Sequence, residues 1–359
     1  VYLMSLINQT PSSLNAQAYA RIVEETSVRR RMLKAANEMA KLAYQEDKDI
    51  ESIINSVEQT VFNISERRTK RDLLPIQAVI SEYYDKVSML SARSDEIFGV
   101  PTGLIDLDRL LGGMQKSDLL IVAGRPASGK TGFLLTVAKN TAIIHKKHVA
   151  IFSLEMSNEQ LVQRMIAQET NINTQRLRSG KIEEHEWDSF AQAVEVLSNT
   201  KIFLDDTPAL TPFQLRTKCR RMHLEHHIDL ILVDYIQLMS GDTRTENRVQ
   251  EVSYISRNLK TLARELNVPV LAAAQLSRAV EQRSDKRPML SDLRESGILE
   301  QDADVVMFLH KKEDDTAETD RSQLVELMVT KHRNGPTKNI ELIFLKDLAQ
   351  FYNAKTVDK

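Results

Sequence analysis

A glycine-rich segment near the middle of the chain has the residue types and spacing of a phosphate-binding loop. In "LLIVAGRPASGKT" an apolar run precedes the pattern G-x-x-x-x-G-K-T, and a helical stretch follows it. Main-chain N–H groups of such a loop wrap phosphates, helped by the N-terminus of the next helix. Lys130 would reach the β and γ phosphates, and the Thr131 hydroxyl would hold Mg²⁺. The expected nucleotide contacts are Gly124, Arg125, Pro126, Ala127, Ser128, Gly129, Lys130 and Thr131.

Three polar side chains stand where other buried strands would end. Glu155 follows "VAIFSL", Asp234 follows "LILV" and Gln275 follows "VPVLAAA". Ligands of open α/β sheets bind at the carboxyl ends of the strands, so these side chains should meet the phosphates. Glu155 can polarise an attacking water, Asp234 can hold Mg²⁺, and Gln275 can sense the γ-phosphate. Taken singly they could be a helix cap, a turn residue and a strand terminator; together they favour a hydrolytic site.

The elements that must position these residues alternate along the second part of the chain. Helical stretches separate short apolar runs, which is typical of an α/β domain with a mostly parallel sheet. Two further runs flank an Asn-Gly-Pro-Thr turn and predict an antiparallel hairpin on that sheet. The strands are predicted at 118–123, 149–154, 201–205, 228–234, 268–275 and 304–309, and the hairpin at 324–331 and 338–345.

The first 98 residues have a different character. Residues 1–65 carry apolar residues at helical spacing on both sides of the polar break "EDKD", which predicts a helical hairpin with little core of its own. Residues 66–98 read as a charged linker ending in Pro75, followed by an amphipathic helix. The remaining domain would span 99–359. Because the chain starts with Val1 inside a helical pattern, we expect the natural start to lie upstream.

Bulk composition narrows the class of protein. The chain has 359 residues, 42% hydrophobic and 27% charged, which is ordinary for a globular protein. A formal net charge of −2 gives no overall attraction to nucleic acid, so any such site must concentrate positive charge locally. One cysteine, Cys219, excludes an internal disulfide framework. The apolar runs are too short to span a bilayer, and we expect a cytoplasmic protein with no membrane segment.

Two cations near the C-terminus stand one residue apart in "VTKHRNGPTK". Alternate residues of a strand point to the same face, so Lys331 and Arg333 should point the same way and His332 the other way. Spacing alone is also compatible with a surface strand whose cations pair with Asp or Glu, and such exposed pairs contribute little to stability. A pair of cations aimed at a phosphate is the alternative.

Beyond these motifs, the chain resembles the DnaB-type replicative helicases, which are ring-shaped hexamers with a RecA-like motor. The resemblance covers almost the whole chain, and the phrases after Asp234 are more specific than the phosphate loop. It implies an α/β fold: a RecA-like P-loop NTPase domain with a mostly parallel sheet, preceded by a partial all-α helical hairpin and a linker helix. The phrases that carry it include "NAQAYARIVEE", "FGVPTGLIDLDRLLGGMQKSDLLIVAGRPASGKT", "FSLEMSNEQLVQRM", "DLILVDYIQLM", "QLSRAVEQRSDKRPMLSDLRESGILEQDADVV" and "KHRNGPT".

The resemblance also implies a role for each matching residue. Glu155 is similar to the family's catalytic glutamate, Asp234 to its Mg²⁺ aspartate, and Gln275 to the glutamine that couples nucleotide to DNA. Lys331 and Arg333 match the lysine and the arginine finger that enter the site of the neighbouring subunit. Such a finger can be worth ~10³–10⁵ in rate.

Two polar loops follow strand ends and are candidates for gripping DNA. The first carries Arg244 and Arg248, and neither loop has an aromatic residue, which favours tracking of the phosphate backbone over base stacking. In the second, the resemblance implies that the arginine, glutamate and glycine of "LRESG" touch the strand. Those residues are Arg294, Glu295 and Gly297.

These features predict a replicative DNA helicase driven by ATP or another NTP with Mg²⁺. By resemblance it is a homohexamer that moves 5′ to 3′ on single-stranded DNA at the replication fork and works with a primase and a loader. A RecA-like recombination ATPase and a P-loop ring without motor activity are the alternatives. Of the family's N-terminal head the resemblance covers only the trailing hairpin; His332 stands where Gln is more frequent, and Ala274 stands where Ser is usual.

Overall fold

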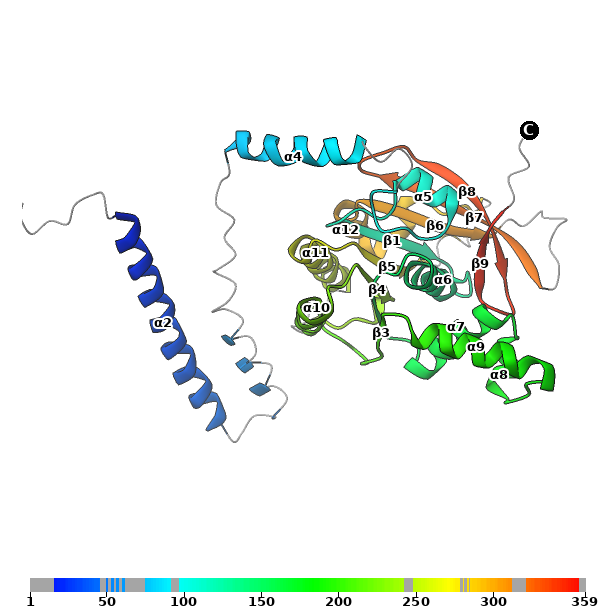
Figure 1. Ribbon diagram of the computed structural model, residues 1–359, viewed down its shortest axis with the longest axis horizontal. Helices are drawn as coiled ribbons and strands as arrows, with labels where there is room; N and C mark the ends of the chain where they lie inside the picture. The colour runs from blue at the N-terminus through cyan, green and yellow to red at the C-terminus, as the bar shows by residue number, and fades with distance from the viewer. Residues whose placement is uncertain are drawn as a thin grey trace, which may run out of the picture. The chain divides into compact units, whose positions relative to one another are not determined.

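The computed structural model divides the chain into two units, Val1–Ala92 and Arg93–Lys359 (Figure 1). In the first unit, α2 (Ala16–Ala43) and α4 (Ile76–Ser91) are helices, as the periodicity predicts. Most of the second helix of the predicted hairpin lies outside the described residues, so the hairpin stays a prediction. Within the described part, no helix is both long and apolar enough to cross a membrane. The structure describes residues 16–45, 50, 53–54, 56–57, 60–61, 75–91, 97–241, 248–277, 280, 283, 285–311 and 321–354.

The second unit is built on one sheet, in which the described residues form nine strands in the order β3-β2-β4-β5-β1-β6-β7-β8-β9. The pairs among β1 to β6 are parallel, and β6 to β9 pair antiparallel. The predicted parallel sheet with an added hairpin is confirmed. Strand β9 was not predicted. The strands are β1 (Leu119–Gly124), β2 (Val149–Ser153), β3 (Ile202–Asp205), β4 (Leu230–Asp234), β5 (Val270–Gln275), β6 (Val305–Lys311), β7 (Ser322–His332), β8 (Lys338–Leu345) and β9 (Gln350–Asn353).

Helices cover both faces of this sheet, which explains why the central strands are apolar throughout rather than alternating. Alternate residues of β1 belong to two separate cores. Leu120 and Val122 pack with α6 and α7 on one face, and Leu119 and Ile121 pack with α10, α11 and α12 on the other. The helices are α5 (Ile105–Leu111), α6 (Lys130–Ile143), α7 (Asn158–Thr170), α8 (Thr174–Arg178), α9 (Trp187–Ser198), α10 (Pro212–His226), α11 (Arg248–Leu266) and α12 (Gly297–Asp302).

Two helix starts that the sequence marks are found where predicted. Ser157 caps α7 and Gln160 reaches back, so both side chains of the capping box are engaged. Thr211 and Gln214 do the same for α10, with Pro212 in its first turn. Short 3₁₀ segments η3 (Glu184–Glu186), η4 (Ile236–Leu238) and η6 (Leu290–Ser296) complete the described elements. The cap of α7 matters for the site, because that helix follows Glu155.

Candidate functional site

The glycine-rich segment forms a tight loop between β1 and α6, as its motif predicts. Gly129 is the N-cap of α6 with φ of 91°, a backbone conformation that favours glycine. Lys130 is the first residue of that helix, and its Nζ donates to the carbonyl oxygens of Gly124 and Arg125, each at 3.1 Å. The ammonium group therefore lies across the mouth of the loop, where main-chain N–H groups and the helix N-terminus favour anions.

The antiparallel end of the sheet packs against this loop. A Cβ on Gly129 would lie 3.0 Å from the ring of Phe351 and 3.1 Å from that of Phe344, and the two rings stack on each other. A Cβ on Gly132 would lie only 2.4 Å from the carbonyl oxygen of Ala349. Both glycines thus permit a close approach of β8 and β9, so these strands help to shape the phosphate site.

Asp234, at the end of β4, lies beside the loop. Its Oδ2 accepts a hydrogen bond from Thr131 Oγ at 2.7 Å. The residue is only 2% exposed, and its Oδ1 is buried with no hydrogen-bond partner among the described residues. An unpartnered carboxylate oxygen beside a hydroxyl fits a hard divalent cation, and Mg²⁺ takes few protein ligands besides phosphate oxygens. Thr131 and Asp234 are therefore chemically suited to the metal role predicted for them.

Burial dominates the electrostatics of this cleft. It raises the pKa of Asp234, against the hydrogen bond from Thr131, and the charge of Glu155 raises it further. Burial also lowers the pKa of Lys130, while the carboxylates of Asp234 and Glu155 oppose that change. Opposite charges thus share a partly buried cleft, where their interactions with a phosphate are stronger than in bulk water.

Glu155 and Gln275 line the same cleft, whose volume is about 470 Å³. Glu155 lies on the bend between β2 and α7, and the Ser153 hydroxyl shapes that bend by donating to Met156 O at 2.8 Å and accepting from Met156 N at 3.1 Å. Gln275 ends β5 on the other side. The lining residues are Pro126, Ala127, Gly129, Lys130, Thr131, Gly132, Glu155, Arg164, Tyr235, Gln275, Lys311, Phe344, Lys346 and Ala349.

Arg164 is a member of this cleft that the sequence reading missed. It lies two turns into α7, and burial lowers its pKa while Asp234 and Glu155 favour its charged form. The capping box at Ser157 could have located it, because a fixed helix start determines which face points back toward the strand ends. This partly buried guanidinium adds positive charge to the cleft from within the same chain.

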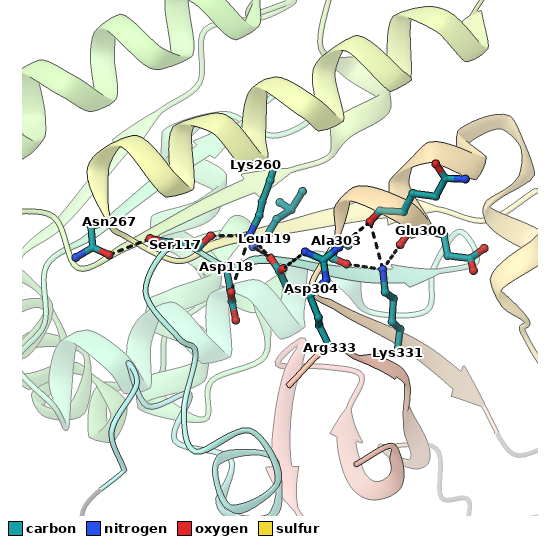
Figure 2. Close-up of polar contacts among 11 residues, drawn as sticks. Ser117, Asp118, Leu119, Lys260, Asn267, Glu300, Ala303, Asp304, Lys331 and Arg333 are labelled. Carbon is teal, nitrogen blue, oxygen red and sulfur yellow. Dashed lines mark hydrogen bonds and ion pairs between the residues drawn. The ribbon is translucent and has the colours of Figure 1, made fainter. Parts of the chain in front are cut away.

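Lys331 and Arg333 do not line the cleft. Both cations point to the C-terminal end of α12, so the prediction that they face the same way is confirmed (Figure 2). Lys331 Nζ donates to the carbonyl oxygens of Glu300, Gln301 and Ala303, the last at 2.7 Å. These are the carbonyls that a helix end leaves unpaired, and a cation there is favourable.

Arg333 forms an ion pair within its own chain. Its Nη1 lies 3.1 Å from Asp304 Oδ1, and its main-chain N–H donates to Asp304 O at 2.8 Å (Figure 2). The alternative of a strand cation pairing with an acidic residue is thus realised in the single chain. His332 points elsewhere, with Nδ1 3.1 Å from Pro336 O in the turn.

The two cations and the phosphate loop lie at opposite ends of β1. Asp304 bonds to Leu119, the first residue of β1, through Leu119 N at 2.8 Å, whereas Gly124 ends the strand at the phosphate loop. Five residue steps along a strand amount to roughly 16 Å. An arginine side chain does not span that distance, so Arg333 is placed where it cannot serve the phosphate loop of its own chain.

The first candidate DNA loop is described only at its edges. Arg244 lies outside the described residues. Arg248 begins α11, and its guanidinium donates to the Glu251 carboxylate and to Gln237 O. Glu251 also accepts from Gly241 N at 2.8 Å, so this carboxylate holds both ends of the loop together.

The second candidate DNA loop leads directly into α12. Arg294 and Glu295 lie in η6, with side chains outside the described set, and Gly297 is the first residue of α12. Of the other cations in this loop, Arg287 is paired with Glu326 at 2.7 Å. The stretch 294–297 therefore runs from the end of η6 into the first residue of α12, the short helix whose other end is held by Lys331.

Comparison with known proteins identifies the family of this chain. Residues 99–353 match the family described as the DnaB-like helicase C terminal domain. The chain is 45% identical over 353 residues to the replicative DNA helicase DnaB of Geobacillus stearothermophilus, covering 98% of this chain and 78% of that protein. Against the replicative DNA helicase DnaB of Haemophilus influenzae the identity is 40%, covering 98% and 77%.

Solved structures agree with the sequence matches. One, titled as a DnaB-like replicative helicase and its interactions with primase, has a TM-score of 0.80 and 31% identity, covering 99% of this chain and 83% of that chain. A second, described as an ATPase domain, has a TM-score of 0.74 and 35% identity, covering 79% of this chain and all of that chain. The predicted RecA-like fold is confirmed, and the helicase class is favoured over the recombination class. The chain belongs to the DnaB-like helicase family.

Proposed function

We propose that this chain is one subunit of a ring-shaped replicative DNA helicase, a homohexamer that hydrolyses ATP or another NTP to move along single-stranded DNA and separate the duplex. Family membership supports the helicase activity. The observation that supports nucleotide hydrolysis is the cleft lined by the phosphate loop and Glu155, with the Thr131–Asp234 pair beside it. Its place of action would be the replication fork in the cytoplasm, with a primase and a loader as partners.

Each residue of the cleft has a distinct task in this proposal. The loop from Gly124 to Thr131 binds the phosphates, and Lys130 places its charge on the β and γ groups. Thr131 and Asp234 would hold Mg²⁺, which neutralises charge on the phosphate oxygens. Glu155 stands on an exposed bend opposite the loop and orients the attacking water.

The opposite placement of Arg333 and the phosphate loop supports hydrolysis between two chains. Because Arg333 lies at the amino end of β1, its guanidinium is available to the phosphate loop of a second copy rather than to its own. Lys331 stands beside it and would leave the α12 carbonyls to join it. Such a finger stabilises charge on the transferred phosphoryl group and makes hydrolysis depend on assembly.

DNA would be held in the ring by the two loops that follow β4 and β5. Arg244 and Arg248 on the first, and Arg294, Glu295 and Gly297 on the second, would contact the phosphate backbone of one strand. Arg248 would have to exchange its bonds to Glu251 and Gln237 for a phosphate, so grip and release can alternate. Movement is 5′ to 3′ by family resemblance.

Mixing two inactive variants tests this proposal. Lys130→Ala removes the phosphate-loop cation, and Arg333→Ala removes the finger; each alone should lose DNA-stimulated ATP hydrolysis. In mixed rings, an Arg333→Ala loop can lie beside the intact finger of a Lys130→Ala chain. We expect the mixture to recover a fraction of the activity that depends on single-stranded DNA. A mixture that stays inactive although the subunits demonstrably exchange would place Arg333 outside any neighbouring site.

A further inference from the structure

Asp304 is a buried acidic residue that the nucleotide cleft does not use. It lies between α12 and β6 and is only 3% exposed. Buried carboxylates are costly unless they are paired. Its partners come from three separate elements, namely Leu119 on β1, Lys260 on α11 and Arg333 after β7 (Figure 2).

The two oxygens of this carboxylate are used differently. Oδ2 accepts from Leu119 N at 2.8 Å and from Lys260 Nζ. Lys260 is itself fixed by a bond of 2.8 Å to Ser117 O. Oδ1 accepts from Arg333 Nη1 at 3.1 Å. One oxygen is therefore anchored to the sheet and to α11, which leaves the other at a fixed position facing the guanidinium.

The main chain adds a second point of attachment for Arg333. Its N–H donates to Asp304 O at 2.8 Å, and Asp304 N donates in turn to Leu119 O at 2.9 Å. The second amino group, Nη2, makes a long contact of 3.4 Å to Gln301 O, and the Arg333 side chain is nevertheless 52% exposed. A guanidinium has five N–H donors in a rigid fork, so a group held along one edge can still offer N–H groups to an anion on its exposed side.

We propose that Asp304 is the positioning residue of the Arg333 finger: it is anchored through Oδ2 to β1 and α11, and through Oδ1 it holds one edge of the guanidinium while the other edge meets a phosphate of a neighbouring chain. This inference rests on the proposed function, because it requires Arg333 to act on a second subunit. A long side chain held in advance loses less freedom on meeting its target, and small misplacements of such a group reduce rates steeply.

Asp304→Asn tests this role with little change of shape. The amide oxygen can still accept from Leu119 N, but the negative charge that holds Arg333 and Lys260 is gone. We expect kcat for DNA-stimulated ATP hydrolysis to fall about 10- to 100-fold, by analogy with other misplaced catalytic groups. KM should be unchanged, since the phosphate loop lies at the far end of β1. In an Arg333→Ala background, Asp304→Asn should not lower kcat any further, because the two residues act as a unit.

A mixed ring separates positioning of the finger from damage to the fold. Asp304→Asn chains keep an intact phosphate loop, and Lys130→Ala chains keep an intact finger with its Asp304. We expect mixtures of the two to recover activity, since Asp304→Asn loops then face normal fingers. If Asp304 served only its own chain, the mixture would stay as low as its components, and that result would overturn the proposal.

The parallel mixture of Arg333→Ala with Lys130→Ala tells the two failures apart. If it recovers and the Asp304→Asn mixture does not, the finger acts between chains but Asp304 does not position it. If neither mixture recovers despite subunit exchange, Arg333 does not act on a neighbouring chain, and both the proposed function and this inference are overturned. Ring assembly and thermal unfolding should be checked for every variant.

Lys260→Met gives a second variant, which removes the bond from Lys260 to Asp304 Oδ2. It should lower kcat by a smaller factor than Asp304→Asn does, and mixing it with Lys130→Ala chains should again restore activity.

Asp118→Asn provides the matched control. It removes one negative charge from the same cluster. The Asp118 carboxylate pairs with Lys260 at 3.9 Å, however, whereas the ion pair of Arg333 is with Asp304. We expect kcat to stay within about twofold of the wild-type value, as for a change beside, rather than in, the bonded unit. An equal loss in Asp118→Asn and Asp304→Asn would mean that the charge of the cluster, and not the bond to Arg333, sets the rate, and would overturn the proposal.

Discussion

Replacing Asp118 by Asn should stabilise the protein at neutral pH. Its side chain is 14% exposed at the amino end of β1. The pKa of Asp118 is raised to about 6: burial raises it most and the neighbouring charge of Asp304 adds to that, while the charges of Lys260 and Arg333 oppose both. In an unfolded chain an aspartate titrates near 3.9. The folded chain therefore holds this proton more tightly than the unfolded chain does.

The sign of the effect follows from that difference. Well below pH 4 the carboxyl of Asp118 is protonated in both the folded and the unfolded chain, and it does not lower the free energy of unfolding. As pH rises from about 4 to 6, the unfolded chain releases the proton first, so the free energy of unfolding falls. Above the folded pKa the penalty is complete, and two pKa units correspond to roughly 3 kcal/mol. Asp118→Asn carries no such penalty and should be more stable than wild type by up to about 3 kcal/mol at pH 8.

Urea unfolding of the two proteins at constant ionic strength, from pH 8 down to pH 4, measures this difference directly. Other carboxylates titrate in both proteins, and the difference between the two curves isolates Asp118. The gain should be largest at pH 8 and should vanish near pH 4. A gain of equal size at every pH, or a variant less stable than wild type at pH 8, would refute the reasoning.

Three further changes test the cleft. Glu155→Gln should keep nucleotide binding, measured with a fluorescent analogue, but lose about 10²–10⁴ in hydrolysis rate, and normal turnover would exclude Glu155 as the group that orients water. Arg164→Met removes a charge that lowers the pKa of Asp234, so the acid limb of the kcat/KM profile should move to higher pH; an unmoved limb would contradict this coupling. Gly132→Ala places a Cβ 2.4 Å from Ala349 O and should cost about 1–3 kcal/mol of stability in urea, whereas an unchanged midpoint would mean that the turn yields freely.

The elements that build the cleft could be predicted because their signals are local. An apolar run with a glycine-rich loop and a helix behind it fixes strand, turn and helix together, and Glu155, Asp234 and Gln275 each follow such a run. Strand ends on one edge of a parallel sheet must meet. The structure accordingly places Glu155 and Gln275 in one cleft and bonds Asp234 to Thr131 beside it.

The features that escaped prediction depend on contacts between distant segments. Arg164 looks like any cation on a helix: the capping box at Ser157 marks where α7 begins, but only the packing of α7 against the sheet shows that this face turns toward Asp234. Strand β9 has four residues, too few for a periodic signal, and is held by pairing with β8. The docking of Lys331 on α12 likewise joins residues about thirty positions apart.

Lys331 and Arg333 show what residue spacing can predict and what it cannot. Their spacing predicts a shared direction, and Figure 2 shows both at the end of α12. The spacing does not predict the buried partner Asp304, because nothing in "QDADVV" distinguishes Asp304 from Asp302. Arg333 stands at the amino end of β1 and the phosphate loop at its carboxyl end, and only the assembled sheet reveals that separation.

Unwinding of a forked DNA duplex with labelled strands tests the central claim most directly. The wild-type protein with ATP and Mg²⁺ should release the labelled strand when a 5′ single-stranded tail is present, and Lys130→Ala should release none. A protein that hydrolyses ATP on single-stranded DNA, leaves the fork intact and instead pairs complementary strands would contradict the helicase account.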